Sequence, residues 1–293
     1  MDRRAFLGTA AAALAAPSLD LGCARADDLP PDVQKCVDRG LAYLVKTQFR
    51  DGHFEGANGQ YPVALTSLAG MAFLMEGSTI REGKYADNIR RIVDYLMDRT
   101  QRSGLIGNPN NQQESQRYTY GHGFGMLFLS CIYGEEDDGD RRTKLEDVLT
   151  RGADFCVKAQ TTKGGWGYVS AADMNDFDEG SVTITQLQAM RAARNAGIVV
   201  AKESIDKAKK YLEVCTGADG HLMYRPGQPG ARPALTAAAI CCGFSMGEYD
   251  SGIVKKWIKA AHKGVGALGG GSGVRFGHDE YAHYYMAQTV YIL

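Results

Sequence analysis

The sequence has almost no excess of charge of either sign. Its 293 residues carry 33 Lys and Arg against 34 Asp and Glu, which gives a net charge of −1 at pH 7. Electrostatics therefore gives no reason to expect nucleic acid or an anionic membrane as a partner. A hydrophobic fraction of 44% and a charged fraction of 23% are typical of a soluble globular protein with one large domain or two small ones.

Motifs that would identify a reaction directly are also missing. The sequence contains no Gly-x-Ser-x-Gly elbow, no phosphate-binding or dinucleotide-binding glycine loop and no His-Glu-x-x-His. No stretch of useful length alternates polar and apolar residues as a strand would. The sequence therefore predicts an all-α protein whose function has to be argued from individual sites.

The seven cysteines lack the spacing of a small disulfide-stabilised scaffold. Six of them follow residue 26 and lie within apolar helical stretches of a chain that is long enough to form its own core. We therefore expect buried thiols at Cys36, Cys131, Cys156, Cys215, Cys241 and Cys242.

The first 26 residues have the pattern of an export signal. Arg3 and Arg4 precede a short alanine-rich apolar run, and Ala24-Arg25-Ala26 has the form of a cleavage site. The run is too short to span a bilayer as a stable helix. The pattern resembles a twin-arginine signal, which implies a bacterial protein exported to the periplasm or cell envelope, with no transmembrane segment after cleavage. We expect the folded domain to cover residues 27–293.

The rest of the sequence repeats itself. Residues 39–54, RGLAYLVKTQFRDGHF, align with residues 151–166, RGADFCVKAQTTKGGW. Both copies contain Arg-Gly, an aromatic residue, a Gln and a Gly-x-aromatic ending. Fainter copies begin at residues 91 and 207, and a fifth begins near Ile253. Copies that recur at intervals of this kind along the chain are the signature of a repeat architecture.

Each copy predicts a pair of helices. The first helix of a pair is amphipathic, whereas the second is apolar nearly all round and rich in small residues, so it must be buried. In three of the second helices a Thr holds the same place, namely Thr66, Thr183 and Thr236. An outer ring of amphipathic helices around an inner ring of small-residue helices is an α/α toroid, here of about five to six pairs. The second helices are expected at 62–75, 122–134, 181–197, 233–247 and 279–293.

The repeat resembles the QW motif of squalene and oxidosqualene cyclases, and the toroid is similar to that of protein prenyltransferase β subunits. The match covers nearly all of residues 32–293. The resemblance implies that the inner helices begin at one mouth, where their free N–H groups favour anions such as a diphosphate. It also implies an apolar lumen suited to an isoprenoid or other lipid-like ligand, unless side chains fill that lumen.

One acidic segment is a candidate for catalysis. Asp176-Phe177-Asp178-Glu179 resembles the Asp-x-Asp-Asp motif of class II terpene cyclases, with Glu in place of the last Asp. The resemblance implies that Asp176, Asp178 and Glu179 form the acidic site and that Asp178 protonates an alkene or epoxide. The alternative is that these carboxylates compensate the dipole of the following helix, with Ser181 as its cap.

Six further residues are candidates for a ligand-binding rim at the mouth. Protein prenyltransferases bind zinc through an Asp-x-Cys at the start of one inner helix and a His on another, and the resemblance places His283 at the position of that His. The only Asp-x-Cys of this sequence, Asp154-Phe155-Cys156, lies in an outer helix instead. A catalytic zinc site needs three converging ligands, so we expect no metal and no cofactor. The alternative for the rim is that Tyr and His fill gaps between loops. The six candidates are Tyr61, Tyr120, His122, Arg232, His283 and Tyr284.

The sequence thus predicts an exported squalene cyclase/prenyltransferase-like repeat protein whose lumen binds an isoprenoid or other apolar ligand, with catalysis left open. One alternative is a non-catalytic binding or scaffold toroid with a partner protein in the cell envelope. Another is a class II terpene cyclase-like enzyme that uses Asp178. Export favours binding, because cyclisation and prenylation are expected in the cytoplasm or at its membrane.

Overall fold

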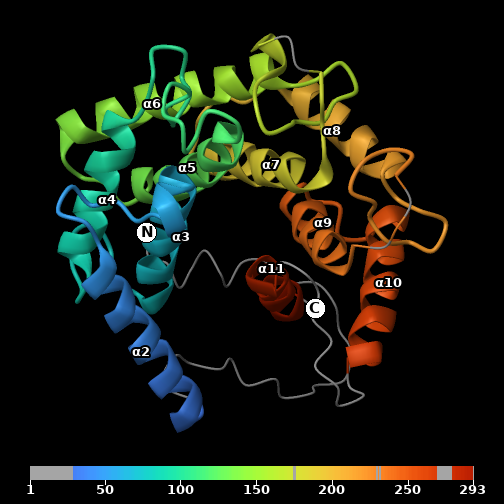
Figure 1. The fold of residues 1–293 in the computed structure, drawn as a ribbon, viewed down its shortest axis with the longest axis horizontal. Helices are drawn as coiled ribbons and strands as arrows, with labels where there is room; N and C mark the ends of the chain where they lie inside the picture. Colours follow the sequence, from blue (N-terminus) through green and yellow to red (C-terminus); the bar gives the residue numbers. More distant parts are fainter. Residues whose placement is uncertain (1–28, 174–175, 229, 231, 269–278, 293) are drawn as a thin grey trace. The chain divides into compact units, whose positions relative to one another are not determined.

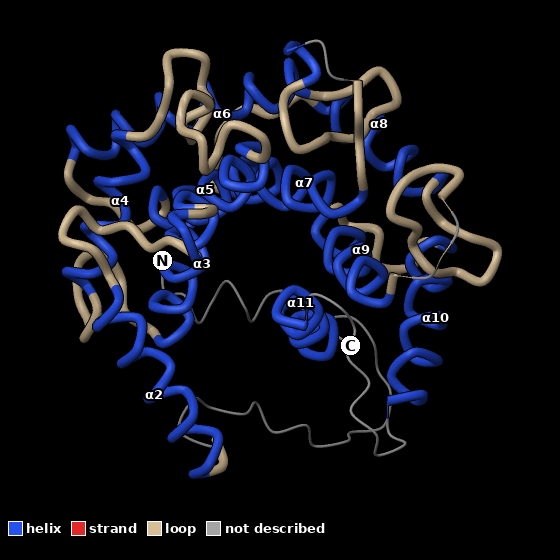
Figure 2. Tube along the Cα trace, in the orientation of Figure 1, coloured by secondary structure: helices blue, strands red, loops and turns tan. Residues whose placement is uncertain are grey.

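The structure, a computed structural model, describes residues 29–173, 176–228, 230, 232–268 and 279–292. Within these residues the chain forms ten α-helices and no strand. Figures 1 and 2 show these helices and the loops between them. The expected all-α fold is confirmed. The expected signal at residues 1–26 lies outside the described residues.

Two kinds of helix alternate along the chain. None of the described helices is long and apolar enough to cross a membrane. The amphipathic helices are α2 (Pro31–Thr47) and four that form an outer layer, α4 (Ala86–Asp98), α6 (Gly139–Ala159), α8 (Lys202–Val214) and α10 (Gly252–Leu268). The inner, small-residue helices are α3 (Pro62–Glu76), α5 (Tyr118–Tyr133), α7 (Gly180–Asn195), α9 (Pro233–Ser245) and α11 (Asp279–Ile292). Two short 3₁₀ helices, η2 (Ala57–Gly59) and η3 (Ala171–Asp173), lie in the loops.

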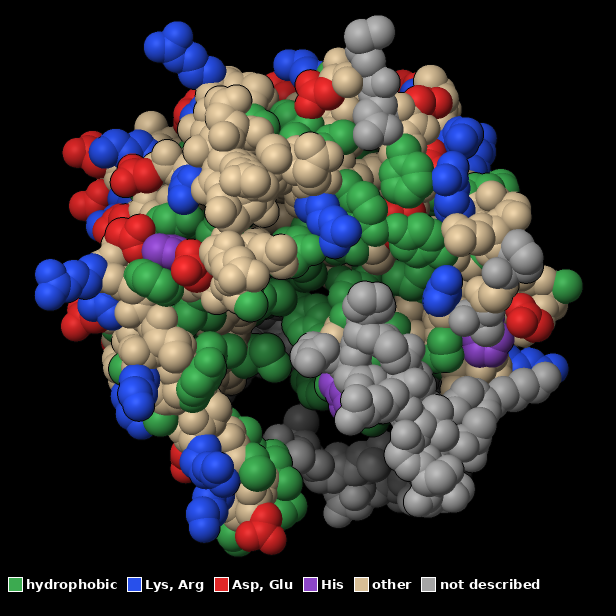
Figure 3. All heavy atoms as spheres, in the orientation of Figure 1, with side chains coloured by type: hydrophobic (Ala, Val, Ile, Leu, Met, Phe, Trp, Pro, Cys, Tyr) green, Lys and Arg blue, Asp and Glu red, His purple; other side chains and the backbone are tan. Residues whose placement is uncertain are grey.

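The chain divides into two compact units, Met1–Tyr43 and Leu44–Leu293. Within the second unit the inner helices pack in chain order, α3 against α5, α5 against α7, α7 against α9 and α9 against α11. The outer helices α4, α6, α8 and α10 each pack against the inner helix that precedes them, and Figure 1 shows the two layers. This alternation is the arrangement of an α/α toroid. Charged side chains gather over the outer layer in Figure 3, whereas apolar side chains dominate around the inner helices.

Small residues allow the inner helices to approach each other closely. A Cβ atom at Gly70 of α3 would lie 2.5 Å from the ring of Phe128 on α5. A Cβ atom at Gly121 of α5 would lie 2.9 Å from the Val63 side chain of α3. These distances are shorter than carbon–carbon contact, so a larger residue would push the two helices apart.

A glycine at the end of each repeat motif lies against the next outer helix. All four glycines have a positive φ, which other residues rarely adopt. A Cβ atom on each would lie only 2.0–2.9 Å from a backbone carbonyl oxygen. The four contacts join Gly52 to Arg91, Gly104 to Arg151, Gly164 to Lys207 and Gly220 to Lys256. The motif of one repeat therefore docks on the start of the next.

The last residue of each motif is bound to the inner helix that follows. Its backbone N–H donates to a side chain near the start of that helix at 2.8–3.1 Å. The first residue of each pair donates and the second accepts: Phe54 to Thr66, Ile106 to His122, Trp166 to Thr183 and Leu222 to Thr236. His122 thus takes the place that Thr holds in the other three repeats.

The Gln and the buried Trp of the repeat motif have an architectural role. Gln160 donates through Nε2 to the carbonyl oxygens of Gly164 and Ser204, both at 2.8 Å, and so ties the end of α6 to α8. The Trp166 side chain is fully buried, and its Nε1 donates to the Cys156 carbonyl at 2.8 Å. Gln48 repeats this link by donating to Gly52 at 3.0 Å and to Asn88 of α4 at 3.1 Å.

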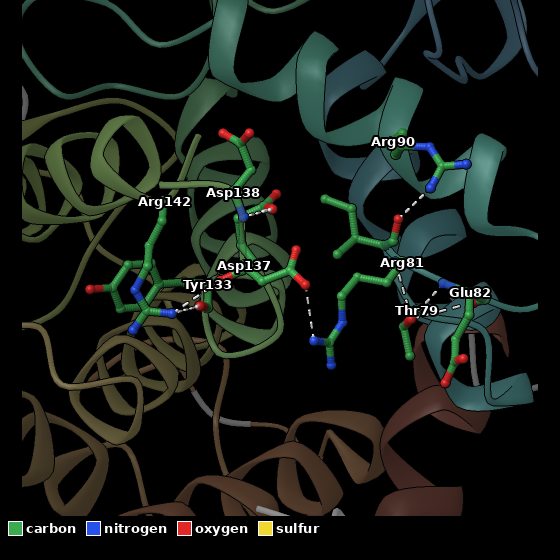
Figure 4. A network of polar contacts seen from close by, with 10 residues as sticks. Thr79, Arg81, Glu82, Arg90, Tyr133, Asp137, Asp138 and Arg142 are labelled. Carbon is green, nitrogen blue, oxygen red and sulfur yellow. Dashed lines mark hydrogen bonds and ion pairs between the residues drawn. The ribbon is translucent and has the colours of Figure 1, made fainter. Parts of the chain in front are cut away.

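A polar network joins the turns at the C-terminal ends of α3 and α5 (Figure 4). Arg81, after α3, forms an ion pair with Asp137, after α5, at 3.3 Å. Arg90 donates to the Ile80 carbonyl at 2.6 Å, and Arg142 donates to the Tyr133 carbonyl at 3.2 Å. These contacts hold the end of the inner helices that lies away from the motif loops.

The six cysteines in the described residues are free thiols. Four of them are buried, Cys131 is partly buried and Cys36 is exposed. Burial raises the pKa of the Cys242 thiol well above its ordinary value, which keeps that group protonated. The expectation of buried thiols thus holds for Cys156, Cys215, Cys241 and Cys242, only in part for Cys131, and not for Cys36.

We predict that Trp166→Ala lowers the free energy of unfolding by about 3–5 kcal/mol, because a fully buried indole and its hydrogen bond are lost. Urea denaturation followed by circular dichroism measures this change. Tyr249→Ala is the matched control, since Tyr249 is 57% exposed and its loss should cost less than about 0.5 kcal/mol. Equal effects of the two substitutions would contradict the assignment of Trp166 to the core.

Candidate functional site

The loops that lead into the inner helices bring aromatic and basic residues together, and we call this set the rim cluster. Tyr61 precedes α3, Arg117 precedes α5, and Tyr120 lies in the first turn of α5. Tyr168 and Phe177 come from the loop before α7, and Tyr224 and Arg225 from the loop before α9. The rim cluster therefore consists of Tyr61, Arg117, Tyr120, Tyr168, Phe177, Tyr224 and Arg225.

Three rings of the rim cluster form a continuous series. Tyr168 stacks on Tyr120 with ring centroids 5.9 Å apart and lies at the same distance from Phe177. The Arg117 guanidinium lies 5.1 Å over the Tyr168 ring, and the Arg225 guanidinium lies 4.7 Å over the Phe177 ring. Both distances are in the range of a cation–π interaction. The arginines are thus held at the two sides of an aromatic surface.

The two guanidinium groups are not neutralised by carboxylates. Arg117 donates to the Tyr61 hydroxyl at 2.6 Å, and this hydrogen bond raises the pKa of Arg117 further. Neither Arg117 nor Arg225 forms an ion pair within the part of the chain that the structure describes. Both lie where inner helices begin, and the dipoles of those helices also favour negative charge. The rim cluster is therefore electropositive.

Glu179 is buried behind Tyr120 and caps α7. Its carboxylate accepts hydrogen bonds from the backbone N–H groups of Ser181 and Val182, both at 2.7 Å. The Ser181 hydroxyl binds the same carboxylate at 2.6 Å and also contacts the Tyr120 hydroxyl. Burial raises the pKa of Glu179 to about 7. Sequence analysis expected Ser181 as the cap, but α7 begins at Gly180, which makes Glu179 the capping residue.

The other two acidic candidates face different surroundings. Asp178 is fully buried, and its Oδ2 accepts a hydrogen bond from Thr161 at the end of α6 at 2.7 Å. Gly165 lies against both the Asp178 side chain and Tyr211 of the outer helix α8, so Asp178 points into the junction of the outer helices. Asp176 is exposed and accepts from the backbone and hydroxyl of Thr162 at 2.8 and 2.6 Å. The structure does not bring the three carboxylates together.

His122 lies in the core rather than in the rim cluster. Its Nδ1 accepts the Ile106 N–H at 3.1 Å, and its Nε2 lies 3.2 Å from the Gly152 carbonyl. Burial lowers the pKa of His122 to about 4, so the ring is neutral at pH 7. The helix begins at Tyr118, four residues earlier than expected, which moves His122 into the second turn. His122 accepts the N–H of the motif where Thr66, Thr183 and Thr236 do so in the other repeats, and this correspondence is the sequence signal for its structural role.

The remaining rim candidates are spread over α9 and α11. Arg232 is exposed and precedes α9, where its carbonyl accepts from the Thr236 N–H at 2.9 Å. His283 is exposed on α11, while Tyr284 is partly buried with its ring edge toward Phe124 of α5. Only Tyr61 and Tyr120 of the six candidates belong to the rim cluster. Sequence analysis missed Arg117, Tyr168, Tyr224 and Arg225, which occur in variable loops outside the repeat motif.

The inner helices differ in how far they are covered. α11 lies against α7 and α9, where the Tyr285 hydroxyl donates to Gln188 and the Thr289 hydroxyl to the Ala237 carbonyl, both at 3.0 Å. One face of α3 is less covered, since its side chains at helical spacing are partly exposed and Met75 is 79% exposed. We call this face the α3 stripe, and it consists of Tyr61, Leu65, Leu68, Ala72 and Met75.

Among the described residues, no group of three or more His, Cys, Asp or Glu side chains is arranged to hold a metal ion. In comparisons with known proteins, no family model and no curated protein matches the chain. The chain is similar to a solved mutant of a family 10 polysaccharide lyase from Cellvibrio cellulosa in complex with trigalaturonic acid. The identity is 14% and the TM-score 0.45, over 66% of this chain and 75% of that chain. A similarity of this size does not bear on function.

We predict that the stability difference between the wild type and Glu179→Gln changes with pH. A Glu titrates at 4.5 when unfolded but at about 7 in this fold, so between these values only the folded state keeps the proton. Wild-type stability should therefore fall as the pH rises through this window, whereas the variant lacks this loss. Thermal unfolding of both proteins should be measured at the acidic and the neutral end of this window. The variant should be less stable than the wild type by a larger margin at the acidic end. A difference that is the same at both pH values would contradict the raised pKa.

Proposed function

We propose that this chain is a squalene cyclase/prenyltransferase-like repeat protein that binds an isoprenoid, or another single-chain lipid, with an anionic head. The observation that carries the proposal is the continuity of the α3 stripe with the rim cluster. Tyr61 belongs to both, and its hydroxyl accepts the hydrogen bond from Arg117. An apolar surface that ends at a guanidinium with no ion pair among the described residues suits an amphipathic anion.

The head of the ligand would lie between Arg117 and Arg225. Both groups are held over aromatic rings, so little side-chain entropy is lost when they bind an anion. The N-termini of α5 and α7 add their dipoles at the same place. A phosphate or diphosphate matches the bidentate geometry of guanidinium.

The tail of the ligand would run along the α3 stripe. Met75 follows Tyr61 by 14 positions in the sequence, which at the rise of an α-helix corresponds to about 21 Å. The side chains between them are apolar and partly exposed. A surface of this length is suited to a tail of several isoprene units, and covering it would remove apolar area from water.

Binding without catalysis is the form of this proposal that the acidic residues support. The Glu179 carboxylate is occupied by three hydrogen-bond donors at the start of α7. Asp178 is fully buried and lies with Thr161 and Gly165 beside Tyr211 of α8. Neither carboxyl is placed to transfer a proton to a ligand on the α3 stripe. A scaffold or carrier in the cell envelope fits this arrangement.

We test the proposal by titrating the purified protein with farnesyl diphosphate and with farnesol in a calorimeter. Arg117→Gln combined with Arg225→Gln should weaken diphosphate binding by roughly tenfold to a hundredfold, because two charge-assisted contacts are lost. Farnesol binding should change little, since it lacks the anion. Arg81→Gln removes the same charge at the opposite end of the inner helices and is the matched control.

Two results would contradict the proposal. The first is that the wild type binds neither compound. The second is that diphosphate binds equally well to the wild type and to the double variant, which would place the anion elsewhere. Inorganic diphosphate alone should bind more weakly than the farnesyl compound, because the tail contributes through the α3 stripe.

Export completes the proposal. The twin-arginine pattern in residues 1–26 supports secretion of the folded protein into the periplasm or cell envelope. Expression of the full chain in a bacterium, followed by N-terminal sequencing of the secreted fraction, should give a mature chain that begins at Asp27. Replacement of Arg3 and Arg4 by Lys should retain the protein in the cytoplasm. Secretion that is unaffected by this replacement would contradict the twin-arginine assignment.

A further inference from the structure

A cavity lies between the outer helix α6 and two loops, and no residue of the rim cluster lines it. It is half-open and has a volume of about 240 Å³. Leu105 comes from the loop after α4, Phe155 and Lys158 from α6, and Asp173 from the loop before α7. Drug-sized sites occupy roughly 300–1,000 Å³, so this cavity suits a smaller molecule.

The floor of the cavity is apolar and rigidly held. Leu105, Phe155 and Tyr118 line it and are only 3%, 8% and 4% exposed. The Tyr118 hydroxyl accepts the Ser170 N–H at 2.7 Å and donates to the Asp173 carboxylate. Because the hydroxyl of Tyr118 is engaged on both sides, its ring is held in place and its polar group is already satisfied.

The wall of the cavity carries two opposite charges that are not paired with each other. Lys158 is exposed in the last turn of α6 and forms no ion pair within the described ranges. Asp173 is exposed and accepts from Tyr118, but it also forms no ion pair there. A cation and an anion that line the same small space without meeting leave both charges available to one ligand.

We propose that this cavity binds a small zwitterion with an apolar side chain, of the kind that a free aliphatic or aromatic amino acid represents. The ligand's carboxylate pairs with Lys158, and its ammonium group pairs with Asp173. The side chain covers Leu105, Phe155 and the ring of Tyr118. A simple anion would be repelled by Asp173 and a simple cation by Lys158, so the charge pattern selects against both.

The test uses L-leucine and L-phenylalanine as probes of the full chain, with ligand-observed NMR and calorimetry. We expect saturable binding with a dissociation constant of about 1 mM or tighter. N-acetyl-L-leucine lacks the ammonium charge and L-leucinamide lacks the carboxylate, so each should bind roughly tenfold more weakly or worse.

Two substitutions and one control locate the site. Lys158→Gln and Asp173→Asn should each weaken leucine binding roughly tenfold, while Asn keeps an oxygen that can accept from Tyr118. Lys163→Gln removes an exposed positive charge that does not line the cavity, and it should leave binding unchanged. Circular dichroism checks that each variant folds.

Three results would overturn the proposal. The first is an absence of saturable binding to the wild type, and the second is unchanged binding to both charge variants. The third is that N-acetyl-L-leucine binds as well as leucine, which would make the cavity a site for an apolar carboxylate instead. None of these results depends on whether the rim cluster binds a lipid.

Discussion

The fold depends on the contact between a glycine at the end of each motif and the backbone of the next outer helix. At Gly52, Gly104, Gly164 and Gly220 a positive φ turns the chain, and no side chain fits between the turn and the neighbouring carbonyl. This contact fixes the distance between successive outer helices. The N–H two residues later then binds the start of the inner helix through Thr or His. One turn thereby positions three helices.

The rim cluster is a consequence of this geometry. Because every motif turn leads to the start of an inner helix, the loops that vary in length and sequence meet at the same end of the inner layer. Arg117 and Tyr168, which are far apart in the sequence, therefore come within 5.1 Å of each other. The opposite end is held by ordinary surface ion pairs such as Arg81 with Asp137. The repeat supplies the scaffold, and the variable loops supply the residues that can recognise a ligand.

The sequence predicts the scaffold much better than the site. The glycine of the motif turn recurs in four copies because the same contact recurs, and the alternation of amphipathic and small-residue segments predicts the order and type of the ten described helices. The rim arginines occur once each in variable loops, and no repeat marks them. Asp178 and Glu179 are adjacent in sequence, yet one faces α8 and the other caps α7, because successive residues before a helix point in different directions. His122 was predictable in principle, since it aligns with Thr66, Thr183 and Thr236.

The most direct measurement is the unfolding free energy of Gly104→Ala against that of Gly139→Ala. A Cβ atom at Gly104 would lie 2.0 Å from the Arg151 carbonyl oxygen at a φ of +90°, whereas Gly139 at the start of α6 has no atom within 4 Å. If the glycine contact sets the spacing of the repeats, Gly104→Ala should cost about 2–4 kcal/mol. Gly139→Ala should be neutral or stabilise by up to about 1 kcal/mol. Equal stabilities of the two variants would contradict the account.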